Sequence, residues 1–491
     1  MDRLWLYGAV ALGLWVVQRI YQALTSPLRT IPGPFYTLFT YLPLKLSIIT
    51  GTRIHFIHAL HQKHGRIVRL SPSEISLSSL AEFKEIHRTG SGYLKTKWYE
   101  KTLMGAAPGV FAMRDIREHA ARRRLLAGAF GKSELRGTME GVVRGKVRVA
   151  VQKMKMEMER DADGQKEEGR CDVLKWWMFL ATDVVGHLIL GEDLGMVELG
   201  VKNEYIHFLE SIMKGSGIYA ELPFAGLMAC HIPIASLRAI FRTSDYLASY
   251  RRRAVINARI NSKSSQNIIS AMIHASDKSD KGLSELDIVA EAGNLIVAGS
   301  DTTAITLTYL VYAVLSQPQL QTELEDEVQG LKEGYNDAIL ETLPLLNAVI
   351  KETLRLYGAA SGSLPRGIPE GGAMLAGHYI PEGFTVSTQS YTIHRDPEIY
   401  PNPEVFDVSR WLGENRKSNS AGQLAFLPFG TGSRICLGIH LAYMELRLAA
   451  AEFFRECRGV KLAPSVTKES MGFENYFLIA PRGHMCEIVS G

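Results

Sequence analysis

A short glycine-rich stretch near the C-terminal end of the chain carries the residue types best suited to hold a metal-containing cofactor. Cys436 stands just before the apolar run 437–454, which is expected to form a helix. At a helix N-terminus, the free N–H groups and the positive end of the dipole favour a thiolate over a thiol. A thiolate fixed in a tight turn is a good axial ligand for a haem iron. The spacing is F-G-x-G-x-R-x-C-x-G, from Phe429, Gly430, Gly432, Arg434, Cys436 and Gly438.

Two plainer interpretations of this stretch remain open from the residues alone. Most lone cysteines in proteins are buried and act as small hydrophobic side chains. Glycine-rich turns also cradle phosphates, but the lysine and the Ser/Thr that follow the second glycine of a P-loop are missing here. Several fixed positions within one short stretch are harder to obtain by chance than a single motif. The joint spacing therefore favours a site for a flat cofactor, which glycine allows the backbone to approach closely.

A second candidate site lies in the middle of a long apolar segment. Ser284 and Asp287 form an S-x-x-D capping box, and the apolar run that follows ends at Leu315, before Pro318. This pattern predicts a helix of about 30 residues, or ~45 Å. A second membrane span over Leu295–Leu315 is the alternative, but the polar residues in its centre would be costly in lipid, which favours a buried central helix.

The polar residues in the centre of this helix have the sequence Ala-Gly-Ser-Asp-Thr-Thr. Ala298 and Gly299 are small enough to let a flat cofactor approach, and Thr302 lies one turn after Ala298 on the same face. Asp301 and Thr302 form an acid–alcohol pair that can stabilise a bound oxygen species and relay protons. Without further information, such a cluster is more often a set of hydrogen bonds that bends the helix.

Length and composition narrow the class of protein. The chain has 491 residues, of which 46% are hydrophobic and 22% charged, which excludes disordered and fibrous proteins. The net charge of +4 is small, and no basic run with interleaved aromatic residues indicates nucleic-acid binding. The 5 cysteines are scattered and odd in number, so a disulfide framework is not expected and a reducing compartment is favoured.

The N-terminal segment is predicted to anchor the chain in a membrane. Residues Leu4–Val17 are apolar, and the stretch extends to Leu24 if its polar residues lie at the interface. A cleaved signal peptide is the alternative, but no small-residue cleavage site follows. Arg19 and Arg29 after the segment place the rest of the chain in the cytosol by the positive-inside rule. We therefore expect an anchor over residues 1–24 and a stiff proline-rich hinge over residues 25–34.

Further motifs follow in a recognisable order. Glu352 and Arg355 give an E-x-x-R pair on one helix, and the segment 403–411 contains Phe406, Arg410 and Trp411. Together with the two candidate sites, these motifs make the chain resemble the cytochrome P450 monooxygenases over essentially its whole length. The IPGP hinge and the segment HAARRRLLAGAF are most similar to fungal microsomal members that tailor secondary metabolites. The family usually has proline where Val408 stands, so we expect a less rigid loop there.

The resemblance implies a fold and a set of site residues. The fold is mainly α with small β-sheets (α+β), as one large haem-thiolate catalytic domain over residues 35–491 behind the transmembrane helix. Asp301 and Thr302 are the implied catalytic proton donors, and a later arginine is expected to bind a buried Glu352–Arg355 pair. Cys436 is the implied axial ligand of haem b, and the other implied cofactor-binding residues are His119, Arg123 and Arg366, which face its propionates, with Ala298, Gly299, Phe429, Gly430, Arg434 and Gly438.

The resemblance also implies an activity and partners. The expected reaction inserts one oxygen atom from O2 into a lipophilic small molecule, by hydroxylation or epoxidation, in fungal secondary metabolite or mycotoxin biosynthesis. Electrons are expected from NADPH through a separate NADPH–cytochrome P450 reductase, with cytochrome b5 as an optional second donor. The expected location is the endoplasmic reticulum membrane, with the catalytic domain on the cytosolic side. Basic residues expected to receive the reductase are Arg122, Arg447 and Arg455, although such residues are often merely solvated.

Two alternative functions remain open. A haem-thiolate isomerase or dehydratase would need no reductase, and the Asp301–Thr302 pair argues against it. A haem carrier or gas sensor without turnover would need no proton relay, and no sensor output domain is visible.

The substrate pocket is expected to depend on residues 97–114, 206–250 and 359–364, of which the apolar span 206–250 is also expected to dip into the membrane. His394 is expected to be a structural hydrogen-bonding residue.

Overall fold

A single long helix, α16 (Glu285–Leu315), runs through the centre of the protein. Its first turn is closed by the expected capping box, in which the Ser284 hydroxyl accepts from the Asp287 backbone N–H and the Asp287 carboxylate accepts from the Ser284 N–H. The computed structural model describes residues 2–103, 107–159, 169–191, 193–201, 214–222, 267–277 and 283–491. Most of the expected pocket span 206–250 lies outside these residues.

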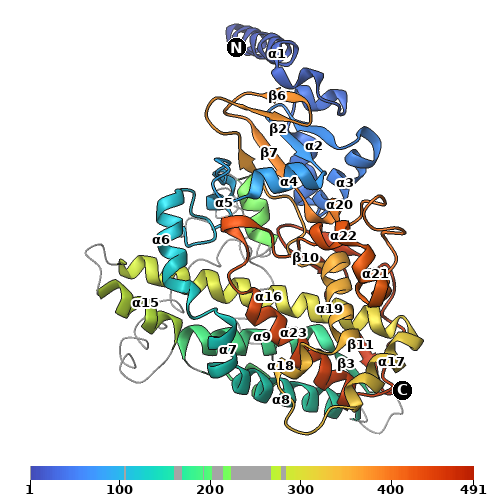
Figure 1. Ribbon diagram of the computed structural model, residues 1–491. Coiled ribbons are helices and arrows are strands. Elements are labelled where there is room, and N and C mark those ends of the chain that lie inside the picture. The colour runs from blue at the N-terminus through green and yellow to red at the C-terminus, as the bar shows by residue number, and fades with distance from the viewer. Residues whose placement is uncertain are drawn as a thin grey trace.

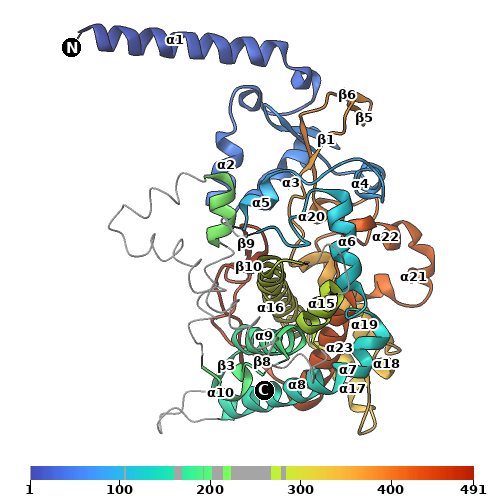
Figure 2. The same ribbon diagram turned by 90° about the vertical axis from the view of Figure 1, so that its left-hand side faces the viewer.

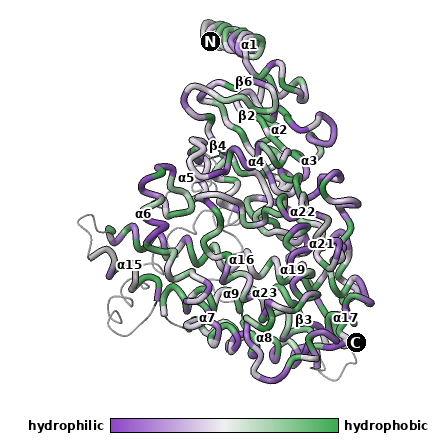
Figure 3. Tube along the Cα trace, in the orientation of Figure 1, coloured by the Kyte–Doolittle hydropathy of each residue, from purple (hydrophilic) through white to green (hydrophobic). Residues whose placement is uncertain are grey.

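Helix α9 (Val173–Leu190) packs along α16, and together they form the middle of the hydrophobic core. Hydrophobic residues are frequent along both helices (Figure 3). Both are long and apolar enough to cross a membrane, but both are mostly buried inside the protein. The prediction of a buried central helix over Leu295–Leu315 is therefore confirmed.

The remaining helices surround this pair in the lower part of the molecule (Figure 1). Helix α23, which follows Cys436, packs against both α16 and α8, and α19 carries the E-x-x-R pair. These helices are α6 (Ile116–Ala127), α7 (Lys132–Thr138), α8 (Glu140–Glu159), α10 (Met196–Leu199), α15 (Ile268–Asp277), α17 (Pro318–Gln329), α18 (Asp337–Leu340), α19 (Pro344–Tyr357), α21 (Gly413–Ser418), α22 (Ser420–Leu424) and α23 (Ile439–Glu456), with the 3-10 helices η3 (Val408–Trp411) and η4 (Gly432–Arg434).

The largest sheet lies in the upper part of the molecule with short helices around it (Figure 1). The largest sheet has the order β1-β2-β7-β4, in which β2 and β7 are parallel and the other pairs antiparallel. Its strands are β1 (Ile67–Ser71), β2 (Glu74–Leu77), β4 (Arg366–Gly367) and β7 (Thr385–Thr388); the short helices are α2 (Leu42–Ile49), α3 (Arg53–His64), α4 (Leu80–His87), α5 (Trp98–Lys101) and α20 (Ser390–Ile393).

Three smaller sheets complete the fold, which is mainly α with small β-sheets as expected. The turn around Pro72 joins β1 to β2. The two-stranded sheets are β5 (Ala373–Leu375) with β6 (His378–Ile380), and β9 (Phe473–Asn475) with β10 (Ile479–Pro481); the three-stranded sheet has the order β3 (Arg170–Asp172), β11 (Glu487–Val489) and β8 (Lys461–Leu462).

The N-terminal helix α1 (Asp2–Thr25) projects away from the rest of the protein (Figure 2). Large apolar side chains along it are exposed, including Trp5, Leu12 and Trp15. It leads into the 3-10 helices η1 (Pro27–Thr30) and η2 (Phe35–Leu38), which cover the proline-rich segment.

Arg69 of β1 binds the proline-rich segment to the main sheet. This buried guanidinium donates from Nη1 to the carbonyls of Leu28 at 2.9 Å and Ile31 at 2.7 Å, and from Nε to Thr37 Oγ1 at 2.9 Å. The Arg69 backbone N–H donates to the Pro32 carbonyl at 2.7 Å. The segment that connects α1 to the rest of the protein is therefore held in one position by the Arg69 guanidinium, which donates to two backbone carbonyls and one hydroxyl of that segment.

We expect Arg69→Met to free this segment while its side chain still fills most of the volume. Hydrogen bonds to a charged group contribute about 1.5–3 kcal/mol each, so trypsin cleavage after Arg29 should accelerate by at least about tenfold. The measurement is the rate of tryptic cleavage at Arg29 in the full chain. The control is Arg66→Met, which removes an exposed arginine paired with Glu398; equal cleavage rates in both variants would contradict the assignment.

Candidate functional site

The glycine-rich stretch forms a tight turn that contains η4 and leads into α23. Gly430 and Gly432 have φ values of 70° and 67°, which residues other than glycine rarely adopt. A Cβ at Gly432 would lie 2.0 Å from the His87 carbonyl oxygen, so no side chain fits there. The Cys436 backbone N–H donates to the Phe429 carbonyl at 2.9 Å, which closes the turn.

Cys436 differs from the other described cysteines in its exposure. Its side chain borders open space, whereas Cys171, Cys457 and Cys486 are buried. The surrounding protein raises the pKa of the Cys436 thiol, while a hydrogen bond from the Gly438 backbone and the charge of Arg123 act in the opposite direction. The helix N-terminus alone therefore does not produce the expected thiolate; coordination to a metal ion deprotonates a thiol outright.

A group of buried or half-buried cationic side chains lies near the cysteine turn. Burial and the neighbouring Arg366 lower the pKa of Arg434 to about 10. Burial, with the charges of Arg366 and Arg434, holds the pKa of Lys95 well below its usual range. Burial, with the charges of Arg434 and Lys95, lowers the pKa of His119 to about 4. We call Lys95, Arg123, Arg366 and Arg434, together with the neutral His119 beside them, the cationic cluster.

Backbone carbonyls and a histidine ring are the partners of this cluster. The Lys95 ammonium donates to the Phe111 carbonyl, and Arg434 donates to the Met113 carbonyl at 2.7 Å. Arg366 lies 3.4 Å from a ring nitrogen of His87. Among the described residues, no acidic side chain forms an ion pair with a member of the cluster. So much buried positive charge fits a ligand with two carboxylates, such as the two propionates of a haem.

Sequence reasoning identified every member of the cationic cluster except Lys95. This residue lies in a loop before α5, and its backbone forms a bridge with Arg366 far along the chain. Nothing in the local pattern distinguishes it from the exposed lysines, because its burial depends on that distant strand.

The centre of α16 has one face that borders open space. Ala298 is exposed and Thr302 is half-buried, although most of the helix is buried. The Thr302 hydroxyl donates to the Ala298 carbonyl at 2.7 Å, so the two residues share a face as expected. Asp301 is buried. Gly299 lies against α9 instead, where a Cβ would be 2.6 Å from the Val185 side chain, so its small size is needed for helix packing.

A buried acid connects α16 to α23 next to this face. The Thr303 hydroxyl donates to Glu445 Oε2 at 3.4 Å. Complete burial raises the pKa of Glu445 well above its usual range, so this carboxyl is neutral. The sequence did not single out Glu445, because an acid in an amphipathic helix is normally exposed.

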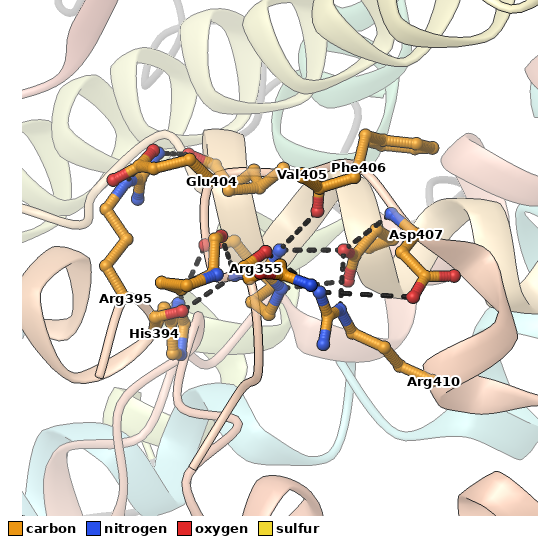
Figure 4. Close-up of polar contacts among 12 residues, drawn as sticks. Arg355, His394, Arg395, Glu404, Val405, Phe406, Asp407 and Arg410 are labelled. Atoms are coloured by element: carbon orange, nitrogen blue, oxygen red, sulfur yellow. Dashed lines mark hydrogen bonds and ion pairs between the residues drawn. The ribbon is translucent and has the colours of Figure 1, made fainter. Parts of the chain in front are cut away.

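Glu352 on α19 is the centre of a buried ion-pair network. Figure 4 shows the polar contacts of its partners Arg355 and Arg410. Its carboxylate accepts from Arg355 at 2.7 and 2.9 Å and from the Trp411 indole N–H at 2.9 Å. Arg410 Nε lies 3.3 Å from it, which confirms the expected later arginine. Arg355 also donates to the His394 and Pro403 carbonyls, both at 2.7 Å. The segment before η3 is thereby held in place without the usual proline at Val408.

His394 links this network to the cysteine turn. Its Nδ1 lies 3.0 Å from the Arg355 carbonyl, and its Nε2 accepts from the Leu427 backbone N–H at 2.9 Å. Leu427 lies shortly before the glycine-rich turn, so one imidazole joins α19 to the segment that leads to Cys436. Burial and the charge of Arg355 lower the pKa of His394 to about 3, so the ring is neutral with its proton on Nδ1. The expected structural role of His394 is supported by these contacts.

Comparison with known proteins agrees with this arrangement. The family model for cytochrome P450 matches residues 32–487. The chain belongs to the cytochrome P450 family. It is 40% identical to the cytochrome P450 monooxygenase stcB of Emericella nidulans over 98% of this chain and 92% of that protein. It is also 40% identical to cypX of Dothistroma septosporum, over 96% and 93%, and 37% identical to aflV of Aspergillus parasiticus, over 99% and 96%.

Membership of the cytochrome P450 family makes this protein an oxidoreductase of the monooxygenase type, and it implies a haem with cysteine thiolate ligation and electrons supplied by a reductase. Two of the basic residues that were expected to contact the reductase are instead buried inside the protein. Arg122 is buried and forms ion pairs of 2.9 Å with Asp287 and Glu291 of α16. Arg447 is buried against Asp337, with an ion pair of 2.6 Å. That expectation is therefore wrong for both, because each has an acidic partner inside this cytochrome P450.

The neutral state of His394 predicts a pH dependence of stability. In the unfolded chain its pKa returns to the usual 6.5, so unfolding binds one extra proton between about pH 3 and 6.5. The free energy of unfolding therefore falls as the pH is lowered through this window, and this residue contributes about 1.4 kcal/mol per pH unit. His394→Gln should reduce the slope by that amount and should also lower stability at neutral pH by about 1–3 kcal/mol.

The measurement is urea unfolding of the holoprotein between about pH 4 and 6. The exposed His440 gives the matched control His440→Gln, which should keep the slope of the unsubstituted protein. Equal slopes in His394→Gln and the unsubstituted protein would show that the imidazole is not held neutral.

Proposed function

We propose that this cytochrome P450 inserts one oxygen atom from O2 into a C–H or C=C bond of a lipophilic small molecule in fungal secondary metabolism, including the biosynthesis of mycotoxins. The observation that carries the proposal is the cationic cluster beside an exposed cysteine, because both fit a haem and neither is explained by packing alone. The similarity to fungal monooxygenases supports the class of pathway.

Haem b would be held from two sides. Cys436 would bind its iron through the thiolate, at the end of the turn that Phe429, Gly430 and Gly438 shape. His119, Arg123, Arg366 and Arg434 would bind the propionates together with Lys95. When bound, the haem supplies the activation of O2 and the one-electron chemistry that no side chain provides.

Two residues of α16 would supply protons to the reaction. The Thr302 hydroxyl, which now donates to the Ala298 carbonyl, turns to donate into the open space on that face. Asp301, buried one residue before it, supplies the next proton through water. Ala298 leaves room for the flat cofactor, and the backbone at Gly299 is fixed against α9.

The remaining parts of the proposal concern location and partners. The exposed apolar side chains of α1 support a single-pass anchor over residues 1–24 in the endoplasmic reticulum membrane, with residues 25–34 as the connection and residues 35–491 as the catalytic domain on the cytosolic side. The electron donors are NADPH–cytochrome P450 reductase and cytochrome b5. The half-buried Arg455 remains a candidate contact for them.

The proposal is tested first at Cys436. Reduced holoprotein with carbon monoxide should give the absorption band of thiolate ligation, and Cys436→Ala should abolish it. Cys457→Ala, at a buried cysteine at the opposite end of α23, should retain the band. Co-expression with a reductase should then give a metabolite heavier by one oxygen atom. A product of unchanged mass would favour the isomerase, and one lighter by one water would favour the dehydratase. Survival of the band in Cys436→Ala would refute the ligand assignment.

Thr302→Ala should retain haem but uncouple reduction from product formation. A proton donor placed in the transition state contributes about 100-fold or more, so product per NADPH consumed should fall by at least about tenfold while hydrogen peroxide rises. The measurement compares NADPH consumption, peroxide and product. Thr308→Ala is the control, because the Thr308 hydroxyl makes the same type of bond, to the Ala304 carbonyl at 2.8 Å, but is buried. Unchanged coupling in Thr302→Ala would exclude the relay role.

A further inference from the structure

Glu221 ties together several segments that are far apart in the sequence. It ends the helical residues 214–221. Its Oε1 accepts from Arg53 Nη1 of α3 at 2.8 Å and from the Trp98 indole N–H of α5 at 3.0 Å. Its backbone carbonyl accepts from the Lys45 ammonium of α2 at 3.1 Å. One carboxylate therefore fixes α5 to α3 at the edge of the molecule.

The same helical residues also contact the C-terminal hairpin. A Cβ at Gly217 would lie 3.0 Å from Tyr476, in the turn between β9 and β10, so backbone and ring pack closely there. The Lys214 ammonium lies 5.1 Å from the Tyr476 ring centre. Residues 214–221 thus bridge the β9–β10 turn on one side and α3 with α5 on the other.

An aromatic cluster lies directly behind Glu221. The ring centre of Trp98 is 6.0 Å from that of Phe477 and 5.3 Å from that of Tyr99. The Phe111 ring is 5.5 Å from Phe477 and 5.6 Å from Tyr99. The Lys95 ammonium lies 4.1 Å from the Phe111 ring centre and 4.3 Å from that of Tyr99. The rings therefore extend without interruption from Glu221 to the cationic cluster.

The aromatic cluster and the contacts of Glu221 are held together by different forces. Ring contacts are apolar and non-directional, so a flat apolar ligand that slides between two rings replaces the contacts that it breaks. The bonds to Glu221 are charge-assisted and directional, and an apolar ligand replaces none of them. Arg53 is almost fully buried, with Glu74 at 3.5 Å as its other acidic neighbour, so releasing Glu221 leaves its charge poorly compensated. Separation at Glu221 is the costly step.

We propose that Glu221 is the latch of a ligand entrance between α5 and the β9–β10 turn, through which flat apolar molecules reach the cofactor along the aromatic cluster. This inference rests on the proposed function in one respect, which is that a haem lies at the inner end of the aromatic cluster. The latch contacts neither the cationic cluster nor the face of α16, so it acts on the rate of passage and not on the affinity of the bound ligand.

The test measures how fast azoles bind to the ferric holoprotein, followed by the spectral shift on nitrogen ligation. In Glu221→Ala, the association and dissociation rates of 4-phenylimidazole should both rise by at least about tenfold, with an unchanged dissociation constant, because only the barrier is lowered. Imidazole, which is small enough to pass without full opening, should change by less than about twofold. Trp98→Phe removes the indole donor while keeping a ring, and it should accelerate 4-phenylimidazole in the same direction.

Glu398→Ala is the matched control, because Glu398 forms an exposed ion pair with Arg66 away from the aromatic cluster. Unchanged 4-phenylimidazole rates in both Glu221→Ala and Trp98→Phe would overturn the latch, and so would an equal acceleration of imidazole. Absence of any azole spectral shift in the unsubstituted protein would instead refute the haem site, so the two failures are distinguishable.

Discussion

The buried carboxylate of Glu352 is the interaction on which the cysteine turn depends. Two guanidinium groups, from Arg355 and Arg410, share it, and the remaining donors of Arg355 are used by backbone carbonyls. A buried ion pair contributes little net stability when complete, but loss of one partner costs about 3–5 kcal/mol because a charge is left uncompensated. The network therefore permits only one arrangement of α19 and the segment before η3, and His394 transmits that arrangement to the backbone that leads to Cys436.

The cationic cluster differs from the Glu352 network, because its charges have no acidic partner among the described residues. Glu352 balances its arginines within the protein, whereas Lys95, Arg366 and Arg434 are buried near one another with backbone oxygens and a histidine as partners. Burial of these charges, and to a smaller extent their mutual repulsion, destabilises the folded chain, as the lowered pKa values of Lys95 and Arg434 indicate. A dianionic ligand would remove this cost, so the stability of the fold and the binding of the cofactor are coupled through the same side chains. The charges of the Glu352 network are balanced within the protein, whereas those of the cationic cluster would be balanced by an anionic ligand.

Elements with local signals could be predicted from the sequence. The capping box at Ser284, the hairpin around Pro72, the E-x-x-R pair and the turn before Cys436 all lie within a few residues of the groups that cause them. Residues whose role depends on distant partners were missed. Lys95 meets Arg366, and Glu445 meets Thr303, across long separations in sequence. Gly299 was assigned to the cofactor because it is small enough to let a flat cofactor approach, but the position of α9 explains its size.

The three consecutive arginines of α6 show why the roles of neighbouring residues cannot be distinguished without the tertiary structure. Each residue of a helix turns the side chain by about 100°, so neighbours in sequence point in different directions. Arg122 is buried against two acids of α16, Arg123 is half-buried and acts on the Cys436 thiol, and Arg124 is exposed. The periodicity placed His119 and Arg123 on one face but could not say which face meets the cofactor. The acids of α16 decide this: because they bind Arg122, they fix the rotation of α6 and so direct His119 and Arg123 toward the cysteine turn.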